Sequence, residues 1–140
     1  MRTLTLLAAL AAFTLPAHAG GSGHVEELTK TQKRMIATLA KRMERNLRRR
    51  HAKEKNSPFE KPVVRYDPAS RTITVTQQLT HYVTENVGDA IRQAVANQKP
   101  NLCLALRPRA VRGTALTIAV RAVEPDGEDI AVAKASQEEC

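Results

Sequence analysis

The two cysteines are the residues whose chemistry the sequence defines most narrowly. Cys103 and Cys140 are the only cysteines of the chain, and they are too far apart in sequence to form a Cys-x-x-Cys redox pair. In an oxidising compartment two thiols have a single intramolecular pairing, which would tie down a chain end that otherwise frays. Two free thiols, or an intermolecular bridge through Cys140, are the alternatives. We expect a structural Cys103–Cys140 disulfide.

The other residue types that catalyse reactions or bind metals are scattered along the chain. No serine lies in a strand–turn–helix nucleophile elbow, and no histidine has a second ligand at helical or strand spacing, as a metal site requires. A glycine-rich phosphate loop is also absent from the sequence. The serines and histidines considered are Ser22, Ser57, Ser70, Ser136, His24, His51 and His81. The sequence therefore predicts no catalytic residue, no metal site and no cofactor, and we expect a protein that is not an enzyme.

Positive charge is concentrated in one segment of the chain. The sequence contains 22 Lys and Arg residues against 14 Asp and Glu residues, a net charge of +8. Residues 30–55 hold eleven of the basic residues and only two acidic ones, Glu44 and Glu54, so the rest of the chain is close to neutral. The residues that we expect to bind anions are Lys41, Arg42, Arg45, Arg48, Arg49, Arg50 and Lys53.

Such a cluster attracts anions, which include lipid phosphates, lipopolysaccharide, nucleic acid and acidic protein surfaces. Nucleic acid is the least favoured of these, because no aromatic residues near the cluster offer stacking positions. We therefore expect the partner to be an unidentified protein or an anionic envelope surface. The alternative is a solvated helix face that only keeps the protein soluble.

The first nineteen residues have the pattern of a secretory signal peptide. Arg2 is followed by an apolar run over residues 4–15 and by Ala17-His18-Ala19, an A-x-A cleavage site. The apolar run is shorter than the about 20 residues needed to cross a bilayer, and no later stretch is long enough. A buried N-terminal helix is the alternative. We predict cleavage after Ala19 and a periplasmic or secreted protein that consists of one domain, residues 20–140.

Apolar spacing predicts a long first helix. Its stripe begins at Val25, and the helix is predicted over residues 25–48, with Glu26 and Glu27 in a first turn where the helix dipole favours negative charge. Residues 48–55 offer nothing large to bury, so we expect a basic helical extension that projects beyond the core. The residues of the stripe are Val25, Leu28, Met35, Ile36, Leu39, Met43 and Leu47.

Two hairpins and a second helix follow in the sequence. Alternating apolar residues predict a hairpin over residues 62–80, with a turn at 67–70. A short helix capped by Thr84 or Asn86 is predicted to end at Lys99-Pro100; its apolar face is formed by Val87, Ile91, Ala94 and Val95. Residues 102–106 form an apolar patch. A second hairpin is predicted over residues 114–135, turning at 125–127.

The predicted order of elements defines the fold class. A helix, a β-hairpin, a helix and a second β-hairpin make an α+β protein. Helices with one apolar stripe and strands with one apolar face must cover each other. We therefore expect both helices to pack on one face of a small antiparallel sheet, with one disulfide that joins the chain end to the segment after the second helix.

The C-terminal part of this layout resembles a known family. Cys103 after the second helix, Arg112-Gly113 before the apolar strand that starts at 114–117, and the terminal Cys140 match the quorum-sensing-regulated virulence factor family of small secreted bacterial proteins. The resemblance implies an α+β fold with a disulfide and no established catalytic residues or cofactor. The basic run at residues 48–55 is not part of the family pattern.

Taken together, these features predict a secreted or periplasmic interaction protein associated with virulence or with the cell envelope. One hypothesis is a binding module that contacts anionic partners through the basic extension of the helix and the exposed face of the sheet, with Arg48, Arg49 and Arg50 as the contacts. The alternative is a periplasmic accessory or chaperone-like protein of a secretion or envelope assembly, which would use an exposed sheet edge.

Overall fold

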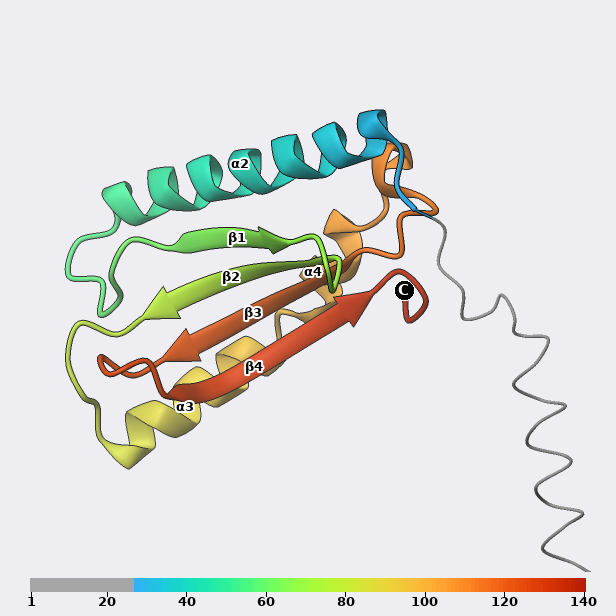
Figure 1. The fold of residues 1–140 in the computed structure, drawn as a ribbon. Helices are drawn as coiled ribbons and strands as arrows, with labels where there is room; N and C mark the ends of the chain where they lie inside the picture. The colour runs from blue at the N-terminus through green and yellow to red at the C-terminus, as the bar shows by residue number, and fades with distance from the viewer. Residues whose placement is uncertain (1–26) are drawn as a thin grey trace, which may run out of the picture.

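The computed structural model describes residues 27–140, apart from the side chain of Ala110 (Figure 1). The predicted signal peptide, residues 1–19, lies outside these residues. None of the helices described is long and apolar enough to cross a membrane. The elements are α2 (Lys30–Lys53), β1 (Val63–Asp67), β2 (Thr72–Gln78), α3 (Glu85–Ala96), α4 (Lys99–Ala105), the short 3-10 helix η1 (Arg109–Val111), β3 (Thr117–Val123) and β4 (Asp129–Ser136).

The four strands form one mixed sheet in the order β1-β2-β3-β4. Both hairpins are antiparallel as predicted, but the central strands β2 and β3 are parallel, with Val75 opposite Val120. The expectation of a purely antiparallel sheet was therefore wrong. The reason lies in the connection, because α3 and α4 carry the chain back along the sheet before β3 begins, and such a helical crossover joins parallel strands.

The core lies between the helices and one face of the sheet. Side chains from α2, α3 and α4 belong to the same buried cluster as the strand residues Ile73, Val75, Ile118 and Val120. The opposite face of the sheet carries the alternate residues of the strands, including the half-buried Thr74. The α+β class and the packing of the helices on one face agree with the sequence analysis.

Helix α2 begins and ends at different residues from those predicted. Thr29 caps it, and a capping box joins Thr29 and Gln32 through two hydrogen bonds of 2.9 and 3.1 Å. Because the capping residue fixes the start, Glu27 precedes the helix, and the first turn contains no acidic residue. The helix then continues through the predicted extension to Lys53.

The extension of α2 was predicted to project beyond the core, but it is bonded to the segment before β1. Arg48 Nε donates a hydrogen bond to the carbonyl oxygen of Pro62 at 3.2 Å. His51 Nε2 lies 2.8 Å from the carbonyl oxygen of Phe59 and donates to it, since a carbonyl only accepts. These bonds attach the last turns of α2 to the segment before β1.

The second helical region consists of two helices. Thr84 caps α3, accepting a hydrogen bond from the N–H of Val87 at 3.4 Å, as predicted. Lys99-Pro100 does not end the helical region but starts α4, because proline is favoured in the first turn of a helix. The apolar patch at residues 102–106 is therefore mostly helical, and it buries Leu102.

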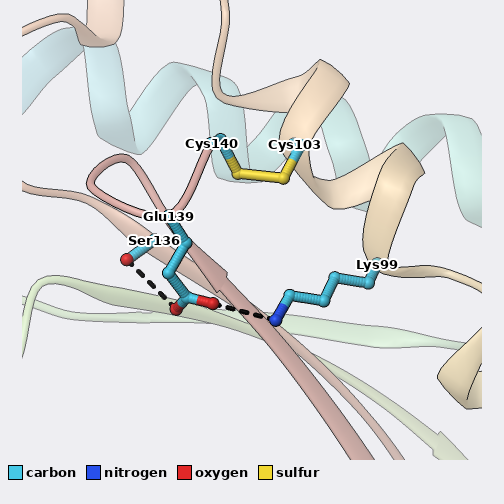
Figure 2. The surroundings of a disulfide bond; sticks show 5 residues. All are labelled: Lys99, Cys103, Ser136, Glu139 and Cys140. Carbon is cyan, nitrogen blue, oxygen red and sulfur yellow. Dashed lines mark hydrogen bonds and ion pairs between the residues drawn. A yellow bond between two sulfur atoms is a disulfide. The ribbon is translucent and has the colours of Figure 1, made fainter.

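The disulfide is confirmed. Cys103 of α4 and Cys140 are joined, with their Cα atoms 5.4 Å apart (Figure 2). Beside this bond, Lys99 Nζ lies 2.9 Å from Glu139 Oε2, and Ser136 Oγ donates to Glu139 Oε1 at 3.2 Å. We call these five residues the C-terminal clasp. The clasp fastens the end of β4 to α4.

The C-terminal clasp should make stability depend on pH. The hydrogen bond from Lys99, with a smaller effect from Ser136, holds the pKa of Glu139 below its usual range. A depressed carboxylate pKa stabilises the fold above the unfolded pKa, and this contribution is lost as the pH falls through the folded pKa. Glu139→Gln should therefore lower the urea midpoint of unfolding at neutral pH, and the difference from wild type should vanish in acid.

The neighbouring Glu138 supplies the matched control for this pH dependence. Glu138 is exposed and makes no ion pair with any residue in 27–140. Glu138→Gln should leave the urea midpoint close to that of wild type at every pH. A constant difference between Glu139→Gln and wild type from neutral to acid pH would contradict the assigned role of the Lys99–Glu139 pair.

Candidate functional site

The outer side of α2 gathers the basic residues singled out by the sequence. Lys41, Arg45, Arg48 and Arg49 are spaced by four, three and one residues, so they share one side of a helix with 3.6 residues per turn. The buried Ile36 and Ala40 lie on the opposite side. The four basic side chains line a shallow depression of about 500 Å³ together with Glu44 and Ala52. We call these four residues the basic face.

The members of the basic face differ in their partners. Arg48 Nη2 lies 3.7 Å from Glu44 Oε2, and its Nε is held by Pro62, so its charge is partly neutralised. Lys41, Arg45 and Arg49 are exposed, and none of the residues 27–140 forms an ion pair or hydrogen bond with their charged groups. These three cations are therefore available to an external anion.

Three further candidates from the sequence take different places. Arg42 and Lys53 are exposed and lie seven residues before and four residues after Arg49, next to the basic face. Arg50 lies on another side of the helix, where it lines a groove. The structure thus brings together six of the seven predicted residues and separates Arg50 from them.

Glu44 has a structural role at the inner border of the basic face. Its Oε2 accepts a hydrogen bond of 2.8 Å from the backbone N–H of Val64 in β1. Because β1 is an edge strand, its outward N–H groups would otherwise offer a template for another strand. Helix α2 therefore covers the β1 edge, and β4 is left as the edge whose outer side pairs with no strand of residues 27–140.

A groove of about 880 Å³ lies between α2 on one side and α3 and α4 on the other. Val75 and Val120 of the central strands are among the residues at its base. Val87 and Leu104, 44% and 53% exposed, line it as well. This groove was not predicted from the sequence. The sequence feature that could have indicated it is the predicted apolar face of α3, which the structure leaves partly uncovered.

The described histidines are engaged locally. His51 is bonded to Phe59, and His81 Nδ1 lies 2.8 Å from Thr80 Oγ1. Within residues 27–140 no group of three or more His, Cys, Asp or Glu side chains is placed to hold a metal ion. Cys103, bound in the disulfide, has no free thiol.

Comparison of the chain with protein-family models, with curated proteins and with solved structures found no match. The assignment of a function therefore depends on the geometry of the basic face, the β4 edge and the groove.

Proposed function

We propose that this is an exported, non-enzymatic binding protein that uses the basic face of α2 to contact an anionic envelope surface. The observation that carries the proposal is the group of three cations, Lys41, Arg45 and Arg49, which share one helix side and have no partner within residues 27–140. Like charges kept together repel one another, and an anionic partner removes that cost. The disulfide is compatible with an oxidising compartment outside the cytoplasm.

An association with virulence is part of the same proposal. It is supported by the resemblance of Cys103, Arg112-Gly113 and Cys140 to the quorum-sensing-regulated virulence factor family. A surface on which Lys41, Arg45 and Arg49 carry unpaired positive charge suits the phosphate groups of an envelope.

Vesicle binding tests the proposal. The protein should sediment with vesicles of phosphatidylglycerol and phosphatidylcholine but not with phosphatidylcholine alone, and added salt should weaken binding. The triple variant Lys41→Gln, Arg45→Gln, Arg49→Gln should lose about two orders of magnitude in affinity, at about 1 kcal/mol per basic residue. Its melting temperature should stay near that of wild type, since the three side chains are exposed.

A second triple variant controls for net charge. Arg107, Arg109 and Arg112 are exposed and lie outside α2, so changing all three to Gln removes the same charge from another part of the surface. This variant should keep most of the affinity. Equal losses in the two triple variants would show a non-specific charge effect, and no loss in the first would show that the basic face is only solvated.

The open edge of β4 supports a second candidate function. An accessory or chaperone-like protein would pair β4 with an extended segment of its partner, since the β1 edge is occupied by Glu44. Lys134 and Val132 are exposed on β4. A complex that persists in high salt would favour this function. Backbone pairing resists screening by salt, whereas contacts of the basic face do not.

A further inference from the structure

The groove between α2 and α3 exists because the two helices cover different edges of the sheet. Helix α2 packs along β1, and α3 packs against β4 and β3 (Figure 1). The central strands are left between them, where Val75 and Val120 contribute to the base of the groove. This arrangement leaves apolar surface that neither helix covers.

The walls of the groove expose apolar side chains. Val87 is 44% exposed and Leu104 is 53% exposed, and Ile91, Ala94 and Met43 line the same space. Fully burying a side chain such as Val or Leu is worth about 1.5–3 kcal/mol, so an apolar ligand would gain by covering them. The volume of about 880 Å³ falls within the range of about 300–1,000 Å³ that is typical of small-molecule sites.

The polarity of the groove changes along its length. The last turn of α2 and its C-cap contribute Arg50, His51 and Glu54, and the segment before β1 contributes Glu60. Met43 lies seven residues before Arg50 on α2, which is about 10 Å along the helix axis at 1.5 Å per residue. The charged side chains of the groove therefore gather where α2 ends, and the rest of its lining is uncharged, with Asn46, Gln77, Gln98 and Asn101 among the apolar residues. A ligand with one charged end fits this pattern.

The charges at the polar end indicate which head group fits. Arg50 makes no ion pair or hydrogen bond with any residue in 27–140, so its guanidinium is free for a ligand. Glu54 and Glu60 repel a head group with several negative charges more strongly than a single carboxylate, and a single carboxylate can take both donors of a guanidinium. His51 is already bonded to Phe59 and holds the end of the groove together.

We infer that the groove binds a linear fatty acid, with its carboxylate on Arg50 and its aliphatic chain along Met43, Ile91 and Leu104. This site is separate from the basic face, since Arg50 lies on another side of α2 from Lys41, Arg45 and Arg49. The inference does not depend on the proposed function, and either can fail alone.

Titration with dodecanoate below its micelle concentration tests the site. Isothermal calorimetry should show one molecule bound per protein. Ala94 is an exposed residue on the groove wall, so the indole of Ala94→Trp would occupy the groove and should lower the affinity at least tenfold. Ala96→Trp adds the same ring to an exposed position of α3 that does not line the groove, and it should bind as wild type does.

A second binding experiment tests the contact between Arg50 and the carboxylate. Arg50→Gln should weaken dodecanoate binding about tenfold or more while leaving the binding of uncharged dodecanol unchanged. Arg42→Gln, an exposed change outside the groove, should affect neither ligand. An equal loss of acid and alcohol in Arg50→Gln would overturn the assignment of the carboxylate.

The remaining outcomes are also decisive. Failure of the wild-type protein to bind dodecanoate, or equal binding by Ala94→Trp and Ala96→Trp, would overturn the groove as a fatty-acid site. Binding of an amphipathic helical peptide without any binding of dodecanoate would do the same. The triple variant of the basic face should keep its dodecanoate affinity within about twofold, so that a failure of vesicle binding is distinguished from a failure of the groove.

Discussion

The double variant Cys103→Ala, Cys140→Ala should be less stable than the oxidised protein by about 4 kcal/mol. The disulfide joins residues 37 apart, and closing a loop of that length removes about 13 cal/mol/K of entropy from the unfolded chain in the chain-entropy model. The loss is large for a small protein, since typical domains are stable by only about 5–15 kcal/mol. Urea denaturation, followed by circular dichroism, measures the difference.

Reduction provides the control for this prediction. Dithiothreitol should lower the urea midpoint of the wild type to near that of the double variant and should leave the double variant unchanged. The last residues of β4 should also exchange their amide hydrogens faster in the variant, because the C-terminal clasp then depends on the Lys99–Glu139 pair alone. A loss below about 1 kcal/mol would contradict the role of the disulfide in stabilising the fold.

Ile36→Ala should destabilise the protein by about 3 kcal/mol. Ile36 is 0% exposed and belongs to the main core cluster, and truncating a buried isoleucine to alanine typically costs about 2–5 kcal/mol. The side chain is the largest that α2 buries completely, so its loss should weaken the packing of the whole helix against the sheet. The free energy of unfolding from urea titration measures the effect.

Met35→Ala is the matched control, because it removes a similar volume one residue earlier. Met35 is 39% exposed, so its truncation should cost less than about 1 kcal/mol. Apolar spacing in the sequence assigns both residues to one stripe. Equal destabilisation by the two changes would mean that α2 packs with a different rotation from the one observed.

The comparison of Met35 with Ile36 shows how far apolar spacing defines a helix. The spacing predicted that α2 exists and that Leu39, Met43 and Leu47 lie on its inner side, where they are half-buried. Adjacent apolar residues lie 100° apart around a helix, so both can belong to one broad stripe. Contact with the sheet decides which of the two is buried, and the pattern of α2 alone does not contain that contact.

The parallel pairing of β2 and β3 was not predictable from strand patterns. Alternation of Ile73 and Val75, and of Ile118 and Val120, shows which face of each strand is buried but not the direction of its neighbour. The signal lay in the connection, because a helix was predicted between the two hairpins and a helical crossover joins parallel strands. Two helices in the connection are long enough to return the chain to the starting end of the sheet.

The basic face and the groove differ in how far the sequence predicts them. The basic face follows from the spacing of Lys41, Arg45 and Arg49 on one helix, so the sequence predicted it. The position of Arg50 in the groove depends on where α3 lies relative to α2. No pattern within a single element shows the distance between two helices, which explains why the groove was missed.

The proposed function depends on export and oxidation of the chain, since the envelope surface that the basic face would contact lies outside the cytoplasm. The most direct test is the intact mass of the native protein, isolated from cells in the presence of an alkylating agent. The account predicts a chain that begins at Gly20, carries no alkyl group and is two hydrogens lighter than its reduced form. A mass that includes the leader, with alkyl groups on both Cys103 and Cys140, would contradict it.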